Sequence, residues 1–486
     1  MPENLAHLAL INWNESEEVA RQKAIARAQK YYRGDQLSYL SARLKEILDL
    51  DGVVSNDKLF HLNIARKVVT AFVERLNVTG FTGEDQAFAD WAYAAWQANR
   101  MDALEREIFK QAKRDGETFV VVSLNDDNEP QFTVTPRFVD SVNGGEGYGC
   151  RAEYPDDDVT QPMKYAVKRW TEDYDEENAE HWTDDQKRAK KRQRMTMYFP
   201  DHLEKFALAK GKWELTQDAD DALDADGWIP WVDASGDPLG IPVIHFRNDE
   251  LECEIDSTVV SMQNLLNKTL IDFAESADAS AFAVWVALGF IPTSDGKPLA
   301  SDGSNRAEIK PGAVIGTNAK PTDANLTRVP GDDPKPLMDA VDRIMLWVAQ
   351  VKDLPPSRFL LGGQTPSAET QKQLDSPLLA HIAQLHTSWG DAFEDMFYCA
   401  RRLANFVSKG FDESALLETV WVNPAIRSDD RDDPLSFWQA IAAAVQSVPG
   451  LDPGGLLKRY GWSDADVASV VGDGVMRDLA GEAITQ

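Results

Sequence analysis

The chain has 486 residues, of which 43% are hydrophobic, including 14 Trp and 20 Phe. This length predicts two or three lobes, and the apolar content excludes a globally disordered chain. The 50 Lys and Arg against 80 Asp and Glu give a net charge of −30, which excludes tight sequence-independent DNA binding by the average surface.

Membrane insertion and secretion are not indicated by the sequence. No apolar run reaches the roughly 18 residues that a membrane helix needs. The opening MPENLAHLAL lacks the basic start and apolar stretch of a signal peptide. Cys150, Cys253 and Cys399 are far apart without CxxC spacing, which predicts a reducing cytoplasm with neither disulfides nor structural zinc.

The first 115 residues are predicted to be helical in three regions. Apolar residues at helical spacing mark residues 14–50 with a break at Gly34, then 63–73, then 85–115, and residues 76–81 lead out of the second region through Gly80. We expect a group of large side chains in the third region to lie in a core rather than to form a ligand platform. These are Trp91, Trp96, Met101, Leu104, Ile108 and Phe109.

From Gly116 the pattern becomes that of β-structure. ETFVVVSLN and PQFTVTPRFV around a turn at residues 126–128 predict a hairpin, and further strands are expected at MKYAVKRW, RMTMYFPDHLEKFAL and KWELT. An acidic stretch (171–186) and a basic one (187–194) interrupt them. The basic octet KRAKKRQR is typical of a nucleic-acid patch or localisation signal, but we favour a solvated hairpin insertion whose halves partly neutralise each other.

The acidic run at residues 218–227 has no EF-hand spacing, so a solvated loop without metal is predicted. His381 and His386 are five residues apart, which does not place two ligands on one face of a helix. They are expected to be packing or surface histidines.

A long helix, a β-rich excursion and a second long helix organise the centre of the chain. From Leu251 onward, apolar residues recur in steps of three and four, from Ile255 to Ala277. Residues 282–318 read as short strands, after which Leu337, Val341, Ile344, Met345 and Val348 share one helical face. Pro355 and Pro356 end that helix. A loop with two glycines follows, then a helix over 367–406 with a break near Pro377, a short strand at VWVNP, and two or three short helices in the tail.

Five phrases in this order resemble one protein family. They are YYRGDQ (31–36), NIARKVVTAFVERLNVTGF (63–81), IPVIHFRN (241–248), LPPSRFLLGG (354–363) and NPAIRSDDRDDPLSFWQAI (423–441). In order and spacing they resemble the portal protein of tailed double-stranded-DNA bacteriophages, and more narrowly the head-to-tail connector family of long-tailed siphophages.

The resemblance implies an α+β portal fold assembled as a ring of 12 or 13 subunits. Its parts would be a mixed α/β wing (1–250), a stem helix (251–281), a β-containing clip with its return (282–335), a second stem helix (336–353), a tunnel loop (354–370), a long helix with the second part of the wing (371–425), and an α-helical crown (426–486). On this view the acidic surface makes a channel wall along which DNA slides. Composition alone equally allows an ordinary acidic or salt-adapted protein.

Two sets of site residues follow from the resemblance. The DNA-facing tunnel loop would present Ser357, Arg358, Gln364, Thr365 and Ser367, with Arg358 and Gln364 as the best phosphate contacts. The alternative is a plain helix–helix connection in which Arg358 pairs with a neighbouring carboxylate. The clip would contact partners or neighbouring subunits through Trp285, Phe290, Ile291, Arg306 and Lys310. An ordinary hairpin in a monomer core is the alternative there.

The implied function is that of a portal at one capsid vertex of the virion, assembled in the host cytoplasm. Partners would be double-stranded DNA read without sequence specificity, the terminase large subunit, a head–tail adaptor, and the major capsid and scaffold proteins, with no membrane. GxxxxGK[ST], GxSxG and HExxH are absent, so no enzyme, catalytic residue, cofactor or metal is predicted. The energy for DNA movement would come from a separate packaging ATPase. Two alternatives stay open: another ring-shaped virion connector or scaffold, and a soluble acidic hydrolase whose site lies among the carboxylates.

Overall fold

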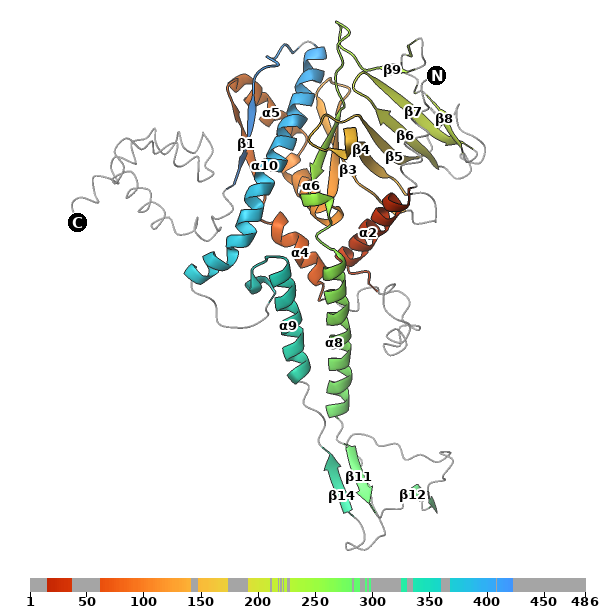
Figure 1. Cartoon of the computed structure of the whole chain (residues 1–486), viewed down its shortest axis with the longest axis vertical. Helices are drawn as coiled ribbons and strands as arrows, with labels where there is room; N and C mark the ends of the chain where they lie inside the picture. The colour runs from red at the N-terminus through yellow and green to blue at the C-terminus, as the bar shows by residue number, and fades with distance from the viewer. Residues whose placement is uncertain are drawn as a thin grey trace, which may run out of the picture.

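A computed structural model describes residues 15–36, 62–140, 147–173, 191–209, 212–216, 218, 221, 223–224, 228–281, 284–288, 293–294, 297–298, 325–329, 335–359, 368–407 and 409–422. These residues form a mixed α and β body from which two long helices project toward a small β-hairpin (Figure 1). The predicted α+β class is confirmed at this level. The predicted crown (426–486) lies outside the described residues.

The elements follow the chain order of Figure 1. The described α-helices are α2 (Ser16–Arg33), α4 (Ile64–Val73), α5 (Gln86–Ala98), α6 (Met101–Asp115), α8 (Ser257–Ala281), α9 (Lys335–Val351) and α10 (Ala368–Phe406). The described strands are β1 (Val78–Gly83), β2 (Glu117–Leu124), β3 (Pro130–Pro136), β4 (Gly149–Glu153), β5 (Tyr165–Asp173), β6 (Lys191–Tyr198), β7 (His202–Ala209), β8 (Lys212–Leu215), β9 (Ile229–Pro230), β10 (Val243–Arg247), β11 (Val284–Leu288), β12 (Thr293–Ser294), β13 (Lys297–Pro298), β14 (Asn325–Val329) and β15 (Leu417–Trp421).

Local signals explain most helix ends. Helix α2 ends at Gly34, whose left-handed backbone (φ 85°) makes the predicted break. Asn63 caps α4 by accepting a hydrogen bond from the Arg66 backbone N–H at 3.1 Å. The predicted region 85–115 is two helices, because Arg100 adopts a left-handed conformation (φ 53°) between α5 and α6.

The strands predicted for the body are present, one of them is split, and β1, β4, β9 and β10 were not predicted. Strands β2 and β3 form the expected hairpin, and β10 joins it to give a three-stranded sheet in the order β10-β2-β3. RMTMYFPDHLEKFAL is two strands, β6 and β7, in a six-stranded sheet of order β4-β5-β6-β7-β8 with β9 beside β7. The lead-out at residues 76–81 continues as strand β1, which pairs with β15. Strand β15 begins three residues before the predicted VWVNP strand and shares only Val420 and Trp421 with it.

The charged hairpin between β5 and β6 differs from its prediction in one respect. Glu172 pairs across the strands with Arg192 and Arg194, so the neutralisation between its two halves is confirmed. The predicted solvent exposure is wrong for both arginines, because their side chains are buried. The guanidinium group of Arg194 also pairs with Asp218 and lies over the Trp170 ring. The folded sheet thus supplies partners that cannot be predicted from a run of basic residues in the sequence.

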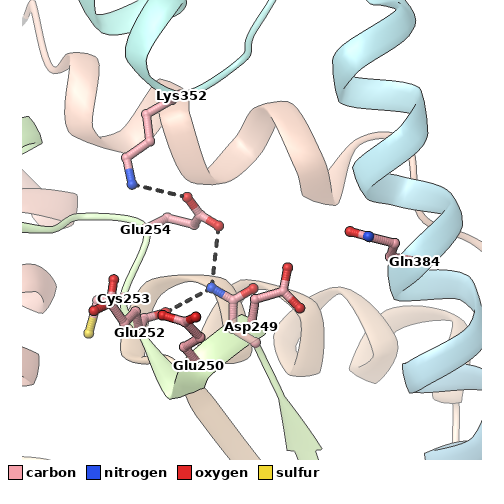
Figure 2. A pocket seen from close by; sticks show the side chains of 8 residues that line it. Asp249, Glu250, Glu252, Cys253, Glu254, Lys352 and Gln384 are labelled. Atoms are coloured by element: carbon pink, nitrogen blue, oxygen red, sulfur yellow. Dashed lines mark hydrogen bonds and ion pairs between the residues drawn. The ribbon is translucent and has the colours of Figure 1, made fainter.

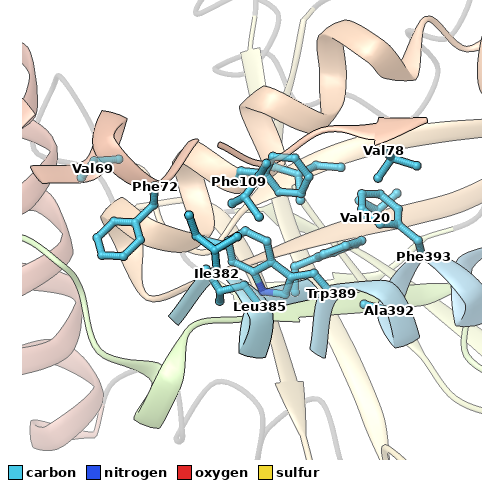
Figure 3. Packing of buried hydrophobic residues seen from close by; sticks show 14 of the residues in the cluster. Val69, Phe72, Val78, Phe109, Val120, Ile382, Leu385, Trp389, Ala392 and Phe393 are labelled. Carbon is cyan, nitrogen blue, oxygen red and sulfur yellow. The ribbon is translucent and has the colours of Figure 1, made fainter. Parts of the chain in front are cut away.

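One large core joins α4, α5, α6, the three-stranded sheet and α10 (Figure 3). The rings of Phe109 and Trp389 stack at 5.1 Å between centroids, and Trp389 donates its indole N–H to the Arg247 carbonyl at 2.7 Å. The six large side chains expected in a core from the third helical region are buried or partly buried in it, which confirms that prediction. Burial of this kind stabilises a fold by roughly 25 cal/mol per Å² of apolar surface.

Helix α10 runs without interruption through Pro377, so no break occurs there. Its apolar face, predicted from the sequence, is buried between Leu378 and Phe397. His386 stacks on Trp421 at 4.5 Å between ring centroids, and burial lowers its pKa to about 4. His381 packs against Phe72 at 5.0 Å between ring centroids, so both histidines pack as expected, but Nε2 of His381 also lies 2.8 Å from the Lys113 ammonium group.

Candidate functional site

Helices α8 and α9 form an antiparallel rod that leaves the body side by side (Figure 1). On α9 the predicted face is buried at Val341, Ile344, Met345 and Val348. The α8 helix begins at Ser257, later than the sequence periodicity indicated. Glu250 and Leu251 have positive φ (52° and 57°), which keeps the preceding residues out of a helix.

The rod keeps large apolar side chains on its surface. Leu265 of α8 is 44% exposed, and Trp347 and Val351 of α9 are 48% and 54% exposed. Trp347 and Val351 are four residues apart and therefore neighbours on one helical face. Met338, nearer the start of α9, is also exposed. Exposed apolar groups of this size on a rod with a buried inner face indicate a contact surface rather than a solvent face.

A buried charge cluster fastens the rod to the body. Lys113, at the end of α6, donates to Glu254 at 3.1 Å and to Asn248 at 2.7 Å, and its side chain has no exposed surface. Lys352, just after α9, pairs with Glu254 at 3.4 Å and with Asp256 at 3.0 Å. The cluster therefore ties the start of α8 and the end of α9 to one point of the body.

The electrostatics of this cluster favour the charged form of Glu254. Burial opposes ionisation of Glu254, but Lys113 and Lys352 outweigh it and hold the pKa of that carboxyl below its usual range. A cavity of about 460 Å³ opens beside the cluster (Figure 2). Asp249, Glu250, Glu252 and Gln384 line it together with Glu254 and Lys352. Acidic side chains dominate the wall of this cavity.

The segment after α9 forms a tight turn anchored at both ends. Leu354 and Phe359 are buried, and residues 356–358 make a single 3₁₀ turn. Ser357 accepts a hydrogen bond from the Gln371 side-chain amide at 3.0 Å. The turn is thus fixed to α4 and α10.

Arg358 extends from this turn toward α4. Its guanidinium group contacts the Glu74 carboxylate at 2.5 Å, while Lys67 donates to the Arg358 carbonyl at 3.4 Å. The alternative prediction, a plain helix–helix connection, expected such a carboxylate partner for Arg358. Gln364, Thr365 and Ser367, the other residues of the predicted loop, lie outside the described part of the chain.

The far end of the rod carries the hairpin of β11 and β14. Trp285 in β11 lies opposite Arg328 in β14, and a second short pair joins β12 to β13. Strand β14 comes later than the excursion at 282–318 suggested. The positions of Phe290, Ile291, Arg306 and Lys310 lie outside the described residues.

The acidic run near residue 218 serves as a counter-charge for basic side chains. Lys205 lies 2.7 Å from both Asp218 and Asp221. In the described residues no group of three or more His, Cys, Asp or Glu side chains is arranged to hold a metal ion. Among those same residues, no helix combines the length and apolar character that crossing a membrane requires.

Sequence reasoning missed the charge cluster at the base of the rod. Lys113 lies on a helix, where a lysine normally indicates a solvent-exposed position. One signal was present, because Lys113 follows Phe109 by four residues and so shares the buried face of α6. Glu254 had no such signal, since its partners come from distant parts of the chain.

A match to a protein family shows which family the chain belongs to. Residues 159–432 match the family described as "Phage portal protein, SPP1 Gp6-like", which is more than half of the chain. The chain therefore belongs to the phage portal proteins, a family of structural virion proteins. Within them it falls in the group that is similar to the SPP1 portal.

Other comparisons add little. A solved chain titled "Virion of native gene transfer agent (GTA) particle" matches with 10% identity and a TM-score of 0.38, over 82% of this chain and 90% of that chain. A score this low does not by itself establish a common fold. No curated protein matches the chain.

Proposed function

We propose that this protein forms the portal ring at one vertex of the capsid. Family membership supports a portal role. The observation that carries the ring is the exposed apolar surface of the rod, at Leu265, Trp347 and Val351. A monomer gains nothing from leaving these side chains in water, whereas a ring buries them against the next subunit through a head-to-tail interface.

The parts of the portal are assigned by this proposal. Helices α8 and α9 are the stem, and the β11–β14 hairpin belongs to the clip. The body is the wing, which includes the later part of α10 and β15, and residues 426–486 are the crown. The clip docks the terminase large subunit during packaging and the head–tail adaptor afterwards, and the body contacts the major capsid and scaffold proteins.

DNA passes through the central channel during packaging and ejection. A net charge of −30 per subunit gives a wall with no deep electrostatic wells for a polyanion, so DNA slides instead of binding tightly. Arg358, together with the residues that follow the turn, is the proposed contact with passing phosphates. In the free chain Glu74 neutralises Arg358, which limits that contact to a weak one.

Negative-stain imaging of the purified protein together with mass measurement tests the proposal. We expect rings with a central hole and a mass near 650 kDa, twelve times the 54.1 kDa of one chain. A thirteen-subunit ring is one chain heavier and supports the same function. A compact monomer that stays monomeric at high concentration, with divalent salt and with scaffold protein added, contradicts it.

A further inference from the structure

A second cavity, of about 630 Å³, lies between the β4–β5 connection, strand β10 and helix α10. It differs from the acidic cavity at the base of the rod in the charge of its wall. Arg247 and Arg402 line it, and Asp395 contributes the one carboxylate among its described lining residues. On a chain with a net charge of −30, this cavity has an excess of positive charge.

Among the described residues, neither arginine is held by a hydrogen bond or a salt bridge, although Arg402 interacts electrostatically with the Asp395 carboxylate. Within the described part of the chain, the guanidinium groups of Arg247 and Arg402 take part in no hydrogen bond or ion pair, although both side chains are half-buried. Other buried arginines of the body are paired. Arg137 contacts Glu18 and Glu117, and Arg401 donates to the backbone carbonyl of Ala415. Half-buried guanidinium groups whose N–H donors have no acceptor are costly, and two positive charges face one carboxylate here, so the cavity indicates a missing anion.

The walls of the cavity hold these groups in place. Gly240 has a positive φ (80°), and a Cβ there would lie 2.6 Å from a terminal nitrogen of Arg402, so only glycine lets that guanidinium group approach. On the opposite side the Tyr154 hydroxyl lies 2.9 Å from Nδ1 of His245, whose Nε2 lies 2.6 Å from Glu117. This chain of contacts fixes the wall beside Arg247.

We propose that this cavity binds a compact oxyanion, a phosphate or a carboxylate, held by Arg247 and Arg402. Guanidinium groups suit such ligands because their planar N–H donors match two oxygens at once. The cavity is larger than the charged group needs, which leaves room for the rest of the molecule that carries it. The site lies within one chain, so the inference does not depend on ring formation. Its natural occupant is either a free phosphate compound or an acidic side chain of a second copy.

Titration calorimetry with inorganic phosphate at low ionic strength tests the site. We expect saturable binding to the wild-type protein that sodium chloride of equal ionic strength does not reproduce. R247Q and R402Q should each weaken binding by about tenfold or more, the usual loss for a charge-assisted hydrogen bond. R106Q removes one charge from the exposed surface of α6 and should leave the affinity unchanged.

Circular dichroism identifies any variant that fails to fold. Each arginine is replaced in its own variant, so the site can still be tested if one of the two variants does not fold. No saturable phosphate binding to the wild type, or equal weakening by R106Q, overturns the proposal. Mass measurement with and without phosphate then assigns the occupant. If phosphate and R402Q both weaken self-association, the occupant is a carboxylate of a second copy, whereas unchanged self-association assigns a free anion.

Discussion

The ammonium group of Lys113 lies 3.1 Å from the Glu254 carboxylate, and the lysine side chain is fully buried. An isolated buried pair of this kind adds little net stability, because desolvation offsets its attraction. Here the pair also positions an element, since Glu254 is shared with Lys352, which follows α9 at the base of the rod. The direction in which the two helices leave the body therefore depends on these charges.

We expect K113M to lower the free energy of unfolding by about 3–5 kcal/mol, because it leaves Glu254 with only one of its two lysine partners. The double variant K113M/E254L should recover much of this loss. K110M is the matched control: it removes a lysine from the same helix that pairs with the more exposed Glu107, and should cost less than about 1 kcal/mol. Guanidinium denaturation measures all three. Equal losses for K113M and K110M would contradict the assigned role of Lys113.

Much of the fold was predictable because its signals are local. The apolar face of α10 and the Gly34 stop are each encoded within a few residues. The β2–β3 hairpin was likewise marked by two β-rich runs around a polar turn.

The missed features depend on tertiary contacts. Arg100 separates α5 from α6 by adopting a left-handed backbone conformation, which an arginine in the sequence does not indicate. Leu251 delays the start of α8 in the same way, although the helical spacing continues through it. Lys113 and Arg194 are buried charged residues whose partners lie on other elements of the chain, so a sequence pattern assigns them to the surface. The candidate site was thus predictable in its helices and loop, but not in the charges that orient it.

Glu105 predicts a pH dependence of stability. Its side chain is fully buried, one oxygen accepts the Val78 backbone N–H at 3.0 Å, and burial raises its pKa to about 8. The folded state therefore keeps a proton that the unfolded state, with a pKa near 4.5, has lost. Stability contributed by this proton is complete below pH 4.5 and is lost as the pH rises toward 8, by at most about 1.4 kcal/mol per unit.

The variant E105Q removes this titration, so the wild-type protein should lose stability relative to E105Q as the pH rises from 5 to 8. Urea denaturation of both proteins across that range measures the difference. E107Q, on the same helix with a pKa held below its usual range, should track the wild type over these pH values. If the difference between E105Q and the wild type stays constant with pH, Glu105 is ionised in the folded protein.

The exposed Trp347 side chain leads to a prediction about ring assembly. Because it is half-exposed on α9 beside Val351, W347D should leave the subunit folded while placing a carboxylate in every stem interface of the ring. We expect monomers in place of rings by analytical ultracentrifugation, with an unchanged far-ultraviolet circular dichroism spectrum. Y93D adds the same charge at a comparably exposed aromatic of α5 in the body, and rings should persist. Rings of W347D with wild-type stability would place the interface elsewhere.

The Arg358–Glu74 pair gives a prediction about DNA. The pair is partly exposed, so R358Q and E74Q should each change the free energy of unfolding by less than about 1 kcal/mol. Their effects on DNA should be opposite in sign. R358Q removes the proposed phosphate contact and should weaken the low-salt binding of double-stranded DNA by assembled rings, whereas E74Q frees the guanidinium group and should strengthen it.

Binding measured at several salt concentrations separates a phosphate contact from a structural role. Each lost contact lowers the slope of log affinity against log salt by about 0.9, so R358Q should flatten the plot and E74Q should steepen it. K67Q is the control, because Lys67 donates to the backbone carbonyl of Arg358 and not to the side chains that form the Arg358–Glu74 pair. Should R358Q and E74Q both bind DNA like the wild type, Arg358 serves only to connect the turn to α4, and the contact with DNA lies in residues beyond it.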